Sequence, residues 1–162
     1  SGIKLGKNDE VIGVDAVKGA QAKGSFLTMS ANGFGKKTDL KEYKVQKRGG
    51  SGVSGAELKE DDFVRHFLTC STHDVLLFFT SRGRVYALKA YEIPEGNRTS
   101  RGKALVNLLA LPNEEKITSA IAIRSFEERK GQETYLMMCT RSGTIKKTAL
   151  SEFEKLDKHE DN

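Results

Sequence analysis

The chain has 162 residues, of which 37% are hydrophobic and 30% charged, a polar composition for a globular domain that still falls short of a disordered chain. No apolar run approaches the roughly 20 residues that cross a bilayer, and no leader pattern opens the sequence, so membrane and secreted classes are disfavoured and a cytoplasmic location is expected. The formal net charge of +5 favours a polyanionic partner.

Short apolar runs predict strands along the whole chain. The run at 75–80 is apolar throughout, which indicates a strand covered on both faces, and helical signals are limited to one turn each at 39–43 and 151–156. Cys70 and Cys139 lie among strand-like residues and are expected to be buried, reduced thiols. The fold class is therefore all-β, with strands expected at 11–14, 26–29, 75–80, 105–111, 117–123 and 135–140.

Three segments repeat one pattern, namely an apolar strand, a glycine turn and an arm that ends in an apolar or aromatic residue. The turn glycines are Gly33, Gly83 and Gly143, at spacings of 50 and 60 residues. Four short strands per unit of roughly 50 residues are typical of propeller blades, and a two-sheet sandwich is the alternative. We predict one domain over 1–150, with about three blade units near 2–52, 53–111 and 112–153, and an acidic tail at 154–162.

Four segments resemble the C-terminal domain of the DNA gyrase A subunit. They are 71–80, 91–95, 98–102 and residues 46–52, Gln-Lys-Arg-Gly-Gly-Ser-Gly, which resemble the box motif Gln-Arg-Arg-Gly-Gly-Arg-Gly of that family. We call residues 46–52 the box; Lys47 and Ser51 depart from the motif. The resemblance runs from 2 to 153, although 2–43 is most similar to a late blade and 61–111 to the first two.

The resemblance implies a six-bladed β-pinwheel, a propeller variant in which blades exchange strands. Its basic rim would bend and wrap double-stranded DNA, so that the complete enzyme, with the rest of gyrase A and with gyrase B, introduces negative supercoils. The chain itself would be non-catalytic, because the DNA-cleaving tyrosine of the family belongs to another domain.

Basic residues at the turns and arms are the candidate DNA contacts. Cations at equivalent places in successive blades would line one rim and follow a bent phosphate backbone, while planar arginines grip phosphate oxygens and glycines allow close approach. A solvated charged surface is the alternative. Base-reading devices are missing, so we expect little sequence readout. The predicted DNA-binding residues are Lys36, Lys37, Gln46, Lys47, Arg48, Gly49, Gly50, Arg82, Arg84, Arg98, Arg101, Lys103, Lys146 and Lys147.

Catalytic and metal functions are disfavoured. His66, Cys70, His73 and Asp74 have spacings that resemble a metal site, but the strand-like run would place the ligands on alternating faces, and a hydrogen-bonded turn at His73–Asp74 is the better interpretation. Nucleophile, phosphate-loop and dinucleotide motifs are missing, and we expect neither a metal nor a cofactor.

Two alternatives to a DNA-wrapping module stay open. A half-pinwheel could bind a protein partner through its unpaired blade edges, and a topoisomerase IV-type domain would keep the blades but lose the box. Two chains could close a six-blade ring as a homodimer, whereas a monomer could cover its edges with the 18–24 loop and the acidic tail. That tail could also compete with DNA for the rim, or be a frayed end.

Overall fold

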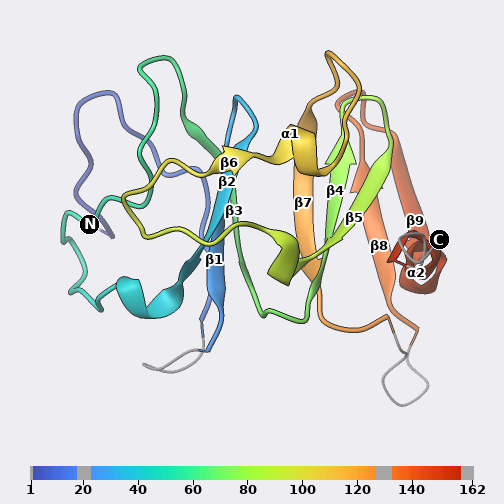
Figure 1. Ribbon diagram of the computed structural model, residues 1–162, viewed down its shortest axis with the longest axis horizontal. Coiled ribbons are helices and arrows are strands. Elements are labelled where there is room, and N and C mark those ends of the chain that lie inside the picture. The colour runs from blue at the N-terminus through green and yellow to red at the C-terminus, as the bar shows by residue number, and fades with distance from the viewer. Residues whose placement is uncertain (1, 18–22, 127–132, 158–162) are drawn as a thin grey trace.

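The computed structural model describes residues 2–17, 23–126 and 133–157 and consists of three antiparallel sheets that lie side by side (Figure 1). The strand orders are β3-β1-β2-β6, β5-β4-β7 and β8-β9, which confirms the all-β prediction. Each helix is a single turn, and within the described ranges none could cross a membrane. The strands are β1 (Ser25–Ser30), β2 (Phe34–Asp39), β3 (Val64–Cys70), β4 (Val75–Thr80), β5 (Val85–Lys89), β6 (Lys103–Ala104), β7 (Ile117–Ile123), β8 (Tyr135–Cys139) and β9 (Ile145–Ala149); the helices are η1 (Leu40–Glu42), η2 (Ala90–Glu92), α1 (Leu105–Leu108), η3 (Leu150–Phe153) and α2 (Glu154–Asp157).

One turn type closes the hairpins β1–β2, β4–β5 and β8–β9. The backbone N–H of Gly33, Gly83 and Gly143 donates to the carbonyl three residues earlier, with the same 3.0 Å distance in each turn. Their φ angles are +80°, +76° and +85°, a region that glycine enters without steric cost. The 3₁₀ turns η1, η2 and η3 come directly after the three hairpins, so the predicted repeat is confirmed, as are the helical turns expected at 39–43 and 151–156.

Each of the first two hairpins receives its outer strand from the following part of the chain. β3 lies in the predicted unit 53–111 but pairs with β1, with Leu68 opposite Leu27. β7 lies in the predicted unit 112–153 but pairs with β4, with Ile121 opposite Leu77. The sheets therefore do not coincide with the units read from the sequence, because neighbouring units exchange strands.

Strand β4 separates two hydrophobic cores. Leu76 and Phe78 point into the first core, which β1 and α1 help to form, whereas Val75 and Leu77 point into the second, with β7 and η3. Alternate residues of a strand face opposite sides, so a strand between two cores must be apolar at every position. The expected two-sided burial of β4 is confirmed.

Two expected strands are not formed. The sequence predicts a strand at 105–111, but Leu105 and Leu109 lie on one face of α1 and the turn after it, both buried in the first core, while Asn107 is exposed. A strand would place Asn107 on the same face as the two leucines. Residues 11–14, the other expected strand, are exposed and pair with no strand of the described chain. Gly13 lies against the ring of Phe67.

The hairpin β8–β9 has one covered and one bare face. Leu136 and Met138 pack against the second core, but Tyr135, Met137 and Cys139 point away from it, and Met137 is 66% exposed. The expected burial of Cys139 is therefore wrong, because no further sheet covers this face within the described residues. The predicted loop 18–24 and acidic tail lie largely outside the described residues, at 18–22 and 158–162.

Candidate nucleic-acid interface

The box is a closed loop beyond η1. The N–H of Gly50 donates to the carbonyl of Lys47 at 3.1 Å, and Gly49 between them has a φ of +83°. The side-chain oxygen of Gln46 accepts from the N–H of Gly52 at 3.2 Å. A β-carbon on Gly50 would lie 2.8 Å from that oxygen, so a side chain there would displace the Gln46 amide that braces the loop.

The N-terminal residues hold the box from one side. The N–H of Gly49 donates to the carbonyl of Gly2 at 3.0 Å, and the N–H of Lys4 donates to the carbonyl of Gly50, also at 3.0 Å. Lys47 and Arg48 are exposed on this supported loop. Two cations at a fixed turn are suited to contact phosphate, because little conformational freedom is lost when they bind.

The second basic segment, the arm loop (residues 96–102), lies against the part of the chain that contains the box. The N–H of Arg98 donates to Glu42 Oε2 at 2.8 Å, and the Arg98 guanidinium donates to the carbonyl of Ser54 at 3.1 Å. The N–H of Glu57 donates to the carbonyl of Ser100 at 3.3 Å. The residues that flank the box on both sides thereby contact a basic segment that lies about 50 residues later in the sequence.

Arg101 and Lys103 extend this surface towards β2. The Arg101 guanidinium lies 4.4 Å from the centroid of the Phe34 ring, a cation–π distance, and its Nε and one terminal nitrogen have no hydrogen-bond partner among the described residues. Lys103 is exposed in β6. At Gly102, where φ is +90°, a β-carbon would lie 2.6 Å from the Gly35 carbonyl, so glycine permits this close approach to β2.

Lys36 and Lys37 differ from expectation. The sequence predicts them on an exposed rim, but they are only 1% and 2% exposed. The arm of the following unit runs along β2, with the Lys37 N–H donating to Pro94 at 2.9 Å and the Gly96 N–H to Lys37 at 3.0 Å, and it covers both side chains. Lys37 also pairs with Glu95 at 3.3 Å. Neither ammonium faces solvent, so we remove both from the DNA-facing set.

The ammonium of Lys36 is directed into the arm loop. It donates to the carbonyls of Asn97 and Arg98 at 2.6 and 2.8 Å. Burial lowers the pKa of Lys36, and the charge of Glu42 opposes that shift. The interaction therefore connects β2 with the basic segment of the next unit.

The arginines at the β4–β5 turn are exposed but differ in charge environment. Arg84 pairs with Glu115 at 3.3 Å, and the Glu115 side chain is fully buried and also accepts a short hydrogen bond from Thr80. Arg82 projects from the same turn with no ion pair described. The positive charge of Arg84 is thus largely offset within the chain, which makes Arg82 the better phosphate contact of the two.

The two lysines of β9 are exposed on the third sheet. Lys147 Nζ lies 3.8 Å from the centroid of the Tyr135 ring on the bare face, and Lys146, the adjacent residue of the strand, points to the opposite side. Figure 1 shows this hairpin at one end of the molecule and the first sheet, with the box beyond it, at the other.

The predicted residues lie in separate segments of the fold. The arm loop contacts residues that flank the box on both sides, whereas the β4–β5 turn and β9 belong to the second and third sheets. Sequence analysis missed the acceptors Glu42, Ser54 and Glu115, which organise Arg98 and Arg84 from 31 to 56 residues away. Nothing in the local sequence distinguishes these residues from other surface polar groups.

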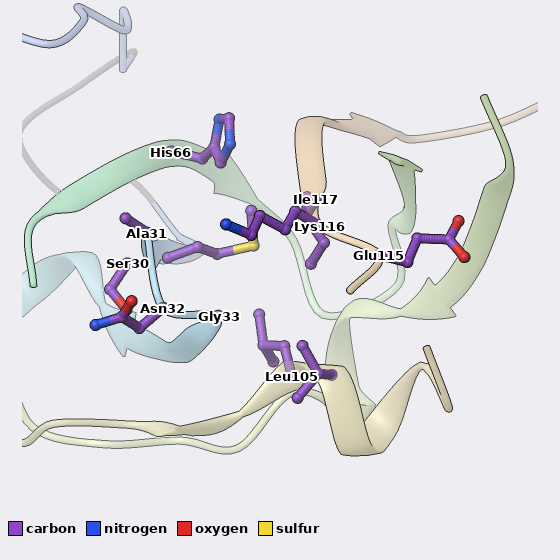
Figure 2. A pocket seen from close by; sticks show the side chains of 11 residues that line it. Ser30, Ala31, Asn32, Gly33, His66, Leu105, Glu115, Lys116 and Ile117 are labelled. Atoms are coloured by element: carbon purple, nitrogen blue, oxygen red, sulfur yellow. The ribbon is translucent and has the colours of Figure 1, made fainter. Parts of the chain in front are cut away.

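A pocket of about 210 Å³ lies between the first two sheets, at the β1–β2 turn (Figure 2). It is lined by His66, Leu105 and Ile117, with Lys116 exposed at its edge. The Nε2 atom of His66 is buried without a hydrogen-bond partner among the described residues, and burial lowers the pKa of His66. None of the predicted DNA-binding residues lines this pocket.

The residues considered as metal ligands have structural roles. Asp74 Oδ2 accepts from the Ser71 N–H at 2.7 Å, which confirms a hydrogen-bonded turn between β3 and β4. Burial raises the pKa of the Cys70 thiol to about 11, so it is protonated near neutral pH. In the described parts of the chain, no group of three or more histidine, cysteine or acidic side chains could hold a metal ion.

Comparisons with known proteins agree with the sheet arrangement. The family model described as "DNA gyrase C-terminal domain, beta-propeller" matches residues 1–18, 24–71, 74–124 and 134–156. The chain is 52% identical to the DNA gyrase A subunit of Mycobacterium leprae and 48% identical to that of Streptococcus pneumoniae, over 128 residues in both cases. These alignments cover 79% of this chain, but only 10% and 15% of the relatives.

Two solved structures are similar in fold. The structure of a DNA gyrase A C-terminal domain has a TM-score of 0.70 at 27% identity, covering 82% of this chain and 42% of that one. The C-terminal domain of a DNA topoisomerase IV has a TM-score of 0.71 at 21% identity, covering 94% of this chain and 44% of that one. The chain therefore spans less than half of either domain.

Proposed function

The chain belongs to the family of DNA gyrase C-terminal β-propeller domains, and from that premise we propose that it is a non-catalytic module that binds, bends and wraps double-stranded DNA. Its relatives are DNA gyrase A subunits, which places it among the accessory domains of type IIA topoisomerases. The rest of gyrase A, gyrase B and a bacterial cytoplasm are the partners and location that this proposal includes.

The observation that carries the proposal is the contact of the arm loop with the residues that flank the box. Four cations, Lys47, Arg48, Arg98 and Arg101, belong to loops that are braced by glycine turns, by Gln46 and by contacts between units, and Lys103 follows in β6. Phosphate oxygens accept charge-assisted hydrogen bonds from such groups, and the guanidinium of arginine can bind two oxygens at once.

Affinity would come from phosphate contacts rather than from base readout. The described helices are three or four residues long, too short to serve as recognition helices. Bending 20–30 base pairs costs of order 1–6 kcal/mol, so several cationic contacts must act together to offset it. We therefore expect unrelated duplexes to compete almost equally for binding.

A salt titration tests the proposal. With about six phosphate contacts, the logarithm of the association constant should fall with the logarithm of salt concentration with a slope of about −5. Binding to relaxed circular DNA, followed by relaxation with topoisomerase I, should also reveal captured writhe. A slope near zero would contradict DNA binding as the function.

The box can be tested with a matched pair of variants. Arg48→Ala should make the salt slope less negative by about 0.9, the value of one phosphate contact, whereas Lys59→Ala should leave it unchanged. Lys59 is equally exposed but lies beside Glu60 and Asp61. Ser51→Arg, which restores the second arginine of the family motif, should increase affinity and captured writhe. Equal and small effects of all three changes would remove the box from the interface.

A second candidate function, association with another copy of the chain, is favoured by the bare face of β8–β9. The repeat aligns Met137 with Leu27 and Leu77, which are fully buried, yet Met137 is 66% exposed. Two chains of about three units each could cover these faces and close a six-blade ring. Light scattering at micromolar concentration should then give twice 17.9 kDa, while 17.9 kDa that persists on DNA would exclude the ring.

A further inference from the structure

The arm loop is built around the side chain of Lys36. A β-carbon on Gly96, where the loop begins, would lie 3.3 Å from Lys36 Cδ, and one on Gly102, where it ends, would lie 3.3 Å from Lys36 Cβ. Between these glycines, the carbonyls of Asn97 and Arg98 accept from the ammonium. The loop therefore encloses both the stem and the charge of one lysine.

Charged groups of the first unit fix this loop on both sides. An ammonium taken out of water is costly unless it is hydrogen-bonded, and the two short bonds to carbonyls provide that compensation. On the other side, the Glu42 carboxylate accepts from the Arg98 N–H at 2.8 Å. Carbonyl oxygens that are bonded to Lys36 are also no longer free to repel a phosphate at the surface of the loop.

We propose that Lys36 is a positioning residue for DNA, which orders the arm loop so that Arg98 and Arg101 can both contact phosphate. This inference rests on the proposed DNA-binding function and gives a role to a lysine that cannot reach DNA itself. It makes the phosphate contacts of the second unit depend on a residue of the first.

The third unit shows the condition for this role. Lys146 occupies the position of Lys36 in the repeat, but it is exposed on β9 and no arm loop encloses it in the described residues. A lysine at this place in the repeat thus orders a loop only where the arm of a following unit crosses the strand.

The test uses the full chain and four variants. Lys36→Met keeps the stem and removes the ammonium, Lys36→Arg restores a cationic donor, and Glu42→Ala loosens the same loop from an exposed position without a change in the core. Lys59→Met is the control, since Lys59 is exposed and outside the proposed surface. Circular dichroism of each variant measures folding, and hydrogen exchange of residues 97–101 measures the order of the arm loop. The salt dependence of binding is measured with a duplex of about 40 base pairs, which is longer than the 20–30 base pairs over which a bend is made.

We expect Lys36→Met to fold, to lose exchange protection in the arm loop, and to make the salt slope less negative by about 2, the loss of two arginine contacts. Lys36→Arg should recover part of the exchange protection and part of the slope, and Glu42→Ala should make the slope less negative by about 1. A merely structural role would reduce stability without a change in the slope of the folded protein.

Two results would overturn the inference. One is a folded Lys36→Met with a loosened loop and an unchanged slope; the other is a loop that stays protected without the ammonium. If Lys36→Met does not fold, the Glu42→Ala variant tests the inference instead. A loosened arm loop with an unchanged salt slope in Glu42→Ala would also contradict the role of Lys36. A wild-type slope near zero would instead refute the proposed function, and with it the role of Lys36, in a measurement that involves no variant.

Discussion

The tripeptide Lys-Lys-Thr occurs twice at the same place in the repeat, and its two copies have opposite environments. In the first sheet, Lys36-Lys37-Thr38 is almost completely buried. In the third sheet, Lys146 and Lys147 are exposed. The strands, the turn type and the following 3₁₀ turn are the same in both places, so the local sequence does not determine the difference.

The difference arises from the segment that comes after each hairpin. The arm of the second unit runs beside β2 and supplies carbonyls and a carboxylate to the two lysines. No such arm lies beside β9 in the described part of the chain. A unit of this fold is thus completed by its successor, and the same residue is a buried structural group or a surface cation according to whether that successor is present.

The largest effect should come from removing apolar contacts in the two places. Leu77→Ala should lower the free energy of unfolding by about 2–5 kcal/mol, because Leu77 is fully buried in the second core. Met137→Ala, at the equivalent position of the bare face, should change it by about 0.5 kcal/mol or less. Urea unfolding of both variants at low protein concentration measures the difference, and a large loss for Met137→Ala would show that the face is covered in solution.

The features that can be predicted from sequence are the local ones. The glycine turns, the 3₁₀ turns and the two-sided burial of β4 depend on residues within a few positions of each other. The error at 105–111 has a physical cause, since a seven-residue apolar run is compatible with a strand and with a short helix.

The features that the sequence could not predict depend on distant partners. The burial of Lys36 needs carbonyls 61 and 62 residues away, and the compensation of Arg84 needs Glu115, 31 residues away. Lys47 and Arg48 are exposed because no segment of the described chain covers their side chains. Sequence reasoning therefore finds the cations but cannot tell which of them the next unit covers.

The two cysteines differ in burial in the same way as the two copies of the tripeptide. Cys70 lies in the first core, where burial raises the pKa of its thiol to about 11, whereas Cys139 lies on the bare face. A thiolate is the reactive form, so a thiol reagent at about pH 8 should modify Cys139 at least about a hundredfold faster than Cys70. Peptide mapping after a short reaction identifies the modified residue. Slow reaction of both cysteines in the folded chain would indicate that a second copy covers β8–β9.

The same substitution in both copies of the tripeptide should have unequal effects on stability. Lys36→Ala removes two hydrogen bonds between a buried ammonium and the carbonyls of the arm loop and should cost about 1–3 kcal/mol. Lys146→Ala removes an exposed side chain and should cost about 0.5 kcal/mol or less. Chemical denaturation measures both. Equal costs would mean that the arm is not held against β2 in solution.

The smallest effect concerns pH and should be confined to the first two sheets. His66 is half-buried between them, and burial lowers its pKa from the ordinary value of 6.5, so the unfolded chain binds a proton on His66 more tightly than the folded chain does. The stability that neutral His66 contributes is therefore complete above about pH 6.5 and is lost as the pH falls towards its folded-state pKa.

Between about pH 7.5 and 5.5, the urea midpoint of the wild type should fall more than that of His66→Gln. The control His73→Gln, in an exposed turn, should behave like the wild type. Hydrogen exchange at the lower pH should locate the loss of protection in β3 and β7, with β8 and β9 unchanged relative to the higher pH. If acid weakens the third sheet to the same extent, the pH response belongs to the whole chain and not to His66.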